Sequence, residues 1–84
     1  MPTPEVIEKV RQLREELATA RPASPEAERI AKQIEAVLAE PEHGPHYDGF
    51  GDRLRDTATS VERDHPKLAA AMTSVLNALS AAGL

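Results

Sequence analysis

Apolar residues recur at alternating spacings of three and four in three stretches of this 84-residue chain, and prolines separate the stretches. This spacing places the apolar side chains on one face of an α-helix. The chain has no cysteine, so neither a disulfide nor a thiolate-bound metal can stabilise it, and its stability must come from packing or from association. The pattern predicts an all-α protein with a single domain over residues 1–84.

The first two stretches open with the same start signal. Thr3, followed by proline, is an expected N-cap and predicts a helix over residues 4–20. Ser24, again followed by proline, predicts a second helix over residues 25–40, which must end before Pro41. Because the two helices have similar lengths and a short connector, they favour an antiparallel helical hairpin.

The third apolar stretch predicts helices over residues 51–64 and 66–82, on either side of Pro66. The alternative to a proline in the helix interior is a new helix that Asp64 caps, with Pro66 in its first turn. Since the apolar spacing continues unchanged across the proline, it favours a kink or a very tight restart at His65-Pro66 over a loop that reorients the chain. A sharp bend closes a small helical bundle, whereas a slight bend gives one helix of about 46 Å whose far half needs a partner. Both arrangements remain open.

Residues 68–84 contain no charged side chain. A solvent-facing amphipathic helix normally displays charged residues on its outer face. The absence predicts a helix covered on more than one side, by the rest of the chain or by a second subunit, and the alternative is an exposed alanine-rich helix, which is stable by propensity. The residues expected at an interface are Leu68, Met72, Val75, Leu76 and Leu79.

Charge and hydropathy exclude several classes of partner. The formal net charge is −4, and no third of the chain has an excess of basic residues, which disfavours nucleic acid and anionic membranes as partners. No uncharged run reaches the roughly 20 apolar residues that a membrane span needs. The N-terminal segment also lacks the pattern of a secretory signal, so a cytoplasmic protein is expected.

The search for catalytic chemistry finds no cysteine nucleophile, no nucleophile elbow and no phosphate-binding glycine loop, so we expect neither an enzyme nor a cofactor. His43 and His46, flanked by Glu42 and Asp48, are weak candidates for binding a divalent metal ion. His65 lies on the apolar seam, where it is either a pH-sensitive element or simply part of a helix restart. These histidines leave one functional alternative open, which is a metal- or ligand-responsive regulator.

Five short segments resemble a family of short bacterial proteins, the domain of unknown function family 4404. They are Leu13-Arg14-Glu15-Glu16-Leu17, Ser24-Pro25-Glu26, Val61-Glu62-Arg63-Asp64-His65-Pro66-Lys67-Leu68, Val75-Leu76-Asn77-Ala78-Leu79 and Gly83-Leu84. The His-Pro step is the most specific of these features. The resemblance implies a small all-helical protein without an assigned activity. From the uncharged stretch 68–84 we expect a non-catalytic interaction or oligomerisation module that self-associates as a homodimer or higher oligomer, or that binds another protein.

Overall fold

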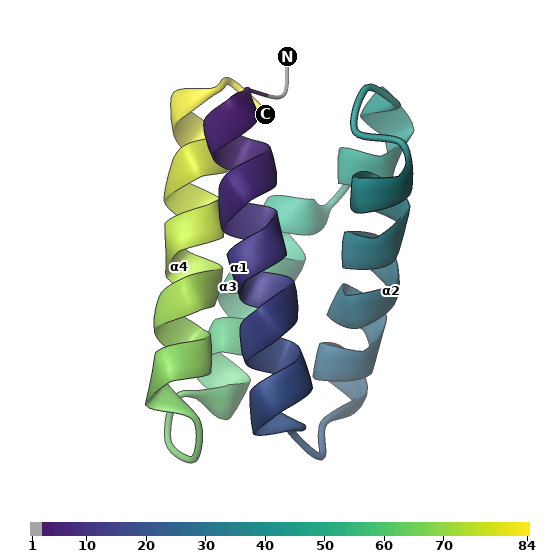
Figure 1. The fold of residues 1–84 in the computed structure, drawn as a ribbon. Helices are drawn as coiled ribbons and strands as arrows, with labels where there is room; N and C mark the ends of the chain where they lie inside the picture. The colour runs from purple at the N-terminus through teal and green to yellow at the C-terminus, as the bar shows by residue number, and fades with distance from the viewer. Residues whose placement is uncertain (1–2) are drawn as a thin grey trace.

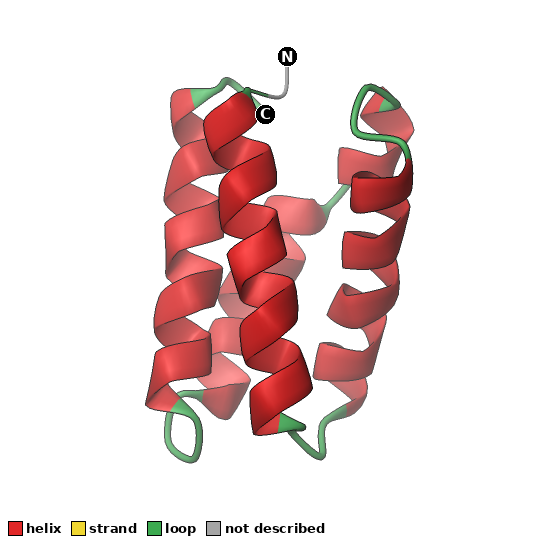
Figure 2. Ribbon diagram, in the orientation of Figure 1, coloured by secondary structure: helices red, strands yellow, loops and turns green. Residues whose placement is uncertain are grey.

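The computed structural model describes residues 3–84 and folds them into four α-helices and one short 3-10 helix, with no strand among these residues (Figure 1, Figure 2). The elements are α1 (Pro4–Ala20), α2 (Pro25–Ala39), η1 (Gly44–Tyr47), α3 (Phe50–Val61) and α4 (Pro66–Ala81). The all-α prediction is confirmed. Three helices begin and end within one residue of their expected bounds, whereas α3 ends three residues early and η1 is not among the expected elements.

Successive α-helices run in opposite directions, and α4 returns to lie beside α1, so the helices form a closed bundle (Figure 1). Both α4 and α2 pack against α1 and α3, from opposite sides of the bundle. The bundle measures 33 × 21 × 19 Å along its principal axes. No helix in the described part of the chain is long and apolar enough to cross a membrane.

The expected N-caps of the first two helices are confirmed. The Thr3 hydroxyl accepts a hydrogen bond from the Val6 amide at 3.2 Å, and the Ser24 hydroxyl accepts one from the Ala27 amide at 3.2 Å. Each bond satisfies an amide that the first turn of a helix leaves without a backbone partner. The alternative of a cap at Asp64 is not found, because His65 occupies the N-cap position of α4 and its side chain makes no capping hydrogen bond.

The break at Pro66 is a reversal of direction. Residues 62–65 form a turn in which the His65 amide donates to the Val61 carbonyl at 2.8 Å, and α4 then runs back along α3 (Figure 1). The expected break between two helices near His65-Pro66 is confirmed, and the sharp bend that closes a small bundle is the arrangement found, whereas the preference for a kink or very tight restart over a loop that reorients the chain is wrong. The connector of four residues is about as long as one helical turn. The spacing of three and four between apolar residues therefore continues in the sequence whether the chain reverses direction or only kinks.

A single apolar core runs through the bundle, and every α-helix contributes to it. The largest fully buried side chains include Leu13, Ile30, Ile34, Phe50, Leu54, Leu68 and Met72. Burying each large apolar side chain contributes about 1.5–3 kcal/mol. Both aromatic residues of the chain lie in this core, so its few large rings are all used for packing.

The C-terminal end of α4 forms a Schellman motif. Gly83 has a φ of 76°, which suits a glycine because it has no Cβ to clash in this left-handed conformation. The Gly83 amide donates to the Ser80 carbonyl at 3.1 Å, and the Leu84 amide donates to the Leu79 carbonyl at 2.9 Å. These are the two hydrogen bonds that define the motif, and they satisfy carbonyls at the end of the helix.

Candidate functional site

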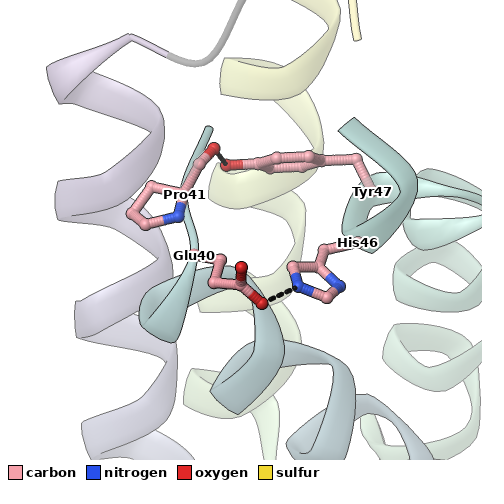
Figure 3. A network of polar contacts seen from close by, with 4 residues as sticks. All are labelled: Glu40, Pro41, His46 and Tyr47. Carbon is pink, nitrogen blue, oxygen red and sulfur yellow. Dashed lines mark hydrogen bonds and ion pairs between the residues drawn. The ribbon is translucent and has the colours of Figure 1, made fainter. Parts of the chain in front are cut away.

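The two loop histidines lie side by side in η1 and the residue before it. Their ring centroids are 4.4 Å apart, and the planes are tilted by 58°. His46 uses its Nε2 to donate a hydrogen bond to Glu40 Oε1 at 3.1 Å (Figure 3). Within residues 3–84, no three histidine or carboxylate side chains are grouped so that they could hold a metal ion. The structure thus brings His43 and His46 together without giving them a third ligand.

The hydrogen bond from His46 has an electrostatic consequence for its partner. It lowers the pKa of the Glu40 carboxyl, because a donated hydrogen bond and a nearby cationic ring both favour the ionised form. Glu40 itself is exposed. The contact closes the loop between the end of α2 and η1, which is a structural role.

The same loop is fastened by Tyr47. Its ring is buried beside Phe50, with the ring centroids 6.5 Å apart, and its hydroxyl donates to the Pro41 carbonyl at 2.7 Å (Figure 3). Burial raises the pKa of the Tyr47 hydroxyl, because the charged phenolate is poorly solvated there. The hydroxyl therefore remains a donor, and the loop is held against the end of the bundle.

Gln33, on α2, also holds the loop in place through hydrogen bonds that could not be predicted from the sequence. Its Nε2 donates to the carbonyls of His46 and Asp48 at 3.0 Å each, and its Oε1 accepts from Arg53 Nη1 at 2.9 Å. One side chain thus joins α2, the loop and α3. The sequence shows only a polar residue beside Ile34, and this does not indicate a partner.

The residues expected at an interface lie mostly in the core of the single chain. Leu68, Met72, Val75 and Leu79 are buried by neighbouring helices, with at most 3% of each residue exposed. Their regular spacing reflects packing within one chain, so these four are not available to a partner in this fold. Leu76 is half-buried and is the one member of the set that also reaches the surface.

Leu76 borders a groove that runs between α3 and α4. The groove has a volume of about 340 Å³. Its middle is lined by small side chains, those of Ala58, Thr59, Ala69, Ala70 and Thr73. The Thr59 and Thr73 hydroxyls donate to carbonyls of their own helices at 3.1 Å each, so these donors are already satisfied inside the helices.

The two ends of the groove differ in charge. Arg55 lines the end at which Leu76 lies, and Glu62 lines the end near Pro66. Leu76 lies against the start of α3, because a Cβ added to Gly51 would be in van der Waals contact with Leu76 Cδ1 at 3.4 Å.

Residues 6–84 match the family model described as Domain of unknown function (DUF4404). The chain belongs to this family. The expected resemblance to this family is thereby confirmed. No curated protein and no solved structure is significantly similar to the chain.

Membership of the DUF4404 family supplies no activity, so the chemistry of the surface must carry the functional argument. The groove contains one cation and one anion, and it contains neither a histidine nor an unengaged hydroxyl. Small side chains with satisfied donors permit close approach of another helix. The arrangement is suited to packing against protein.

Proposed function

We propose that this protein is a small non-catalytic helical module that self-associates through the face formed by α3 and α4. The observation that carries the proposal is the chemistry of α4. After Lys67 the chain has no charged side chain, although Ala70, Thr73 and Asn77 are exposed on the outer side of the helix. Surface helices normally place charged residues on such a side.

The groove supports the same assignment because it lies directly beside this uncharged side. Ala70 and Thr73 belong both to the outer side of α4 and to the groove, and Leu76 adds a partly exposed apolar side chain. Depletion of charge and exposure of apolar atoms are typical of the central part of a protein–protein interface. The proposed surface is therefore the groove together with the outer side of α4, and it is called the α3–α4 face below.

The proposal is tested by measuring mass in solution with light scattering at micromolar concentration. We expect the wild-type chain to show an oligomeric mass and Ala70→Glu to show the mass of a single chain, because a carboxylate would be buried in the interface. Ala18→Glu is the matched control, since Ala18 is an exposed alanine on α1 and outside the proposed face.

Two outcomes would contradict the proposal. One is a wild-type chain that is strictly monomeric under these conditions. The other is a fall in mass that is equal for Ala70→Glu and Ala18→Glu, because association would then depend on charge in general and not on the α3–α4 face. Circular dichroism of both variants establishes that they remain helical.

A further inference from the structure

We infer that the partner at the α3–α4 face is a second copy of this chain, related by a two-fold axis through the middle of the groove, with Arg55 of each copy against Glu62 of the other. This inference rests on the proposed function and adds the orientation of the two copies. In such an arrangement the two α3 helices run antiparallel across the axis. The same patch then serves both copies, as it does in any two-fold interface.

The positions of the two charges on α3 are the first support. Arg55 and Glu62 are seven residues apart, so they lie on one side of the helix about 10.5 Å apart along its axis. Glu62 follows the last residue of α3 and keeps helical backbone angles, with φ −55° and ψ −40°. Both charges therefore border the same groove, one toward each end.

The centre of this pair is the second support. In an antiparallel pair of identical helices, a two-fold axis brings together residues that are equally far from it in opposite directions. The midpoint of Arg55 and Glu62 falls between Ala58 and Thr59, which line the same groove. An axis at this point forms the Arg55–Glu62 pair twice and places only small side chains at the crossing, where the two backbones come closest.

The ends of the groove on α4 match in the same way. Leu76 lies at the Arg55 end, against the start of α3, and Pro66 lies at the Glu62 end. The axis that exchanges the two charges also exchanges these ends, so Leu76 of one copy approaches Pro66 of the other. Apolar side chains thus meet apolar side chains, and a cation meets an anion at both ends.

A second copy fits this face better than a strongly charged partner does. The groove has one positive and one negative end, so a uniformly acidic or basic partner would meet a like charge at one of them. In the single chain, Arg55 Nη1 lies 3.7 Å from Asp52 Oδ1, and both side chains are more than half exposed. Such a surface pair contributes little, so Arg55 can exchange Asp52 for a carboxylate of the second copy.

The orientation is tested with two charge reversals, Arg55→Glu and Glu62→Arg. Each variant alone would place like charges together at both ends of the groove, and we expect its dissociation constant to rise at least tenfold. When the two variants are mixed in equal amounts, every pair across the axis again joins a cation and an anion. We expect the mixture to form a heterodimer with nearly the wild-type dissociation constant, as measured by light scattering and native mass spectrometry.

Arg11→Glu is the matched control, because Arg11 is exposed on α1 and the change of charge is identical. The inference is overturned if the mixture dissociates as readily as the separate variants, or if neither reversal weakens a dimer that Ala70→Glu does disrupt. In the second case self-association through the face stands and the two-fold orientation is wrong. A wild-type monomer would instead overturn the proposed function itself.

Discussion

The α1–α2 side and the α3–α4 side of the bundle are built on the same apolar spacing, but they present different surfaces. On the first side charged residues project outward, and Arg14 Nη1 lies 3.6 Å from Glu35 Oε1 between the two helices. On the second side α4 has no charge after Lys67, and a groove with small walls lies beside it. The apolar spacing of a helix indicates which side packs in the core, and the residues on its outer side separately indicate what that side can contact.

The outer side is the more informative of the two for function. A charged outer side is stabilised by hydration, and an exposed ion pair such as Arg14–Glu35 contributes at most about 1 kcal/mol. An uncharged outer side gains less from water, and its small residues allow another helix to approach closely. The contrast is the reason for assigning self-association to α3 and α4 and not to the bundle as a whole.

The largest expected loss of stability comes from a substitution on the buried side of α4, and it is compared with one on the outer side. Met72 is fully buried, so Met72→Ala should lower the free energy of unfolding by about 2–5 kcal/mol. Leu76 is half-buried, so Leu76→Ala should cost the single chain less, while it weakens self-association. Denaturant unfolding at a dilution that keeps the chain monomeric measures the first quantity, and light scattering at micromolar concentration measures the second.

The contrast between the two sides of α4 would fail if the two substitutions destabilised the single chain equally and Leu76→Ala left the oligomeric mass unchanged. Leu76 would then be one more core residue. Met72→Ala is expected to leave the oligomeric mass unchanged, because the Met72 side chain is covered by the chain's own helices.

A second, smaller effect is expected where the two sides of the bundle are tied together. Gln33→Leu removes hydrogen bonds to His46, Asp48 and Arg53. Since these bonds are partly or fully exposed, we expect a loss of about 1–2 kcal/mol. For a chain of this length, this corresponds to a fall of roughly 4–16 °C in the melting temperature.

Gln12→Leu is the matched control for that change, because Gln12 is exposed on α1. Equal melting temperatures for the two variants would show that the Gln33 bonds do not stabilise the junction of α2 with α3. A selective loss in Gln33→Leu would show that they do.

The features that could be predicted from the sequence are those determined by nearby residues. Thr3 and Ser24 cap helices through amides three positions away, and the apolar seams need only the period of a helix. The Gln33 contacts could not be predicted in this way, because they join residues 13 to 20 positions apart by polar groups that have many possible partners.

Two features of the second half of the chain were ambiguous for a geometrical reason. Residues 62–65 occupy about one helical turn, so the apolar phase does not distinguish a kink from a reversal. The seam of α4 likewise has the same spacing whether it faces its own chain or a second one. The structure assigns Met72 to the core and leaves Leu76 at the surface, a division that the spacing alone does not contain.

The smallest expected effect is a pH dependence of stability at the loop between α2 and η1. The hydrogen bond from His46 holds the pKa of Glu40 below its ordinary value, so the carboxyl has a lower pKa when folded than when unfolded. Its contribution to stability is therefore fully present above the unfolded pKa of about 4.3 and is lost as the pH falls through the folded value. Glu40→Gln removes the titrating group. The melting temperature of the wild type should exceed that of Glu40→Gln at pH 7, and the difference should shrink as the pH falls through the lowered pKa of Glu40.

Glu15→Gln supplies the comparison for this prediction, because it removes one carboxylate from an exposed site on α1. If the two variants follow the same pH profile, the loss seen in Glu40→Gln reflects net charge and not the contact with His46. If only Glu40→Gln converges with the wild type as the pH falls, the contact is specific. The junction would then be stabilised by a hydrogen bond at the loop, whereas charges on the α1–α2 side act mainly through solvation.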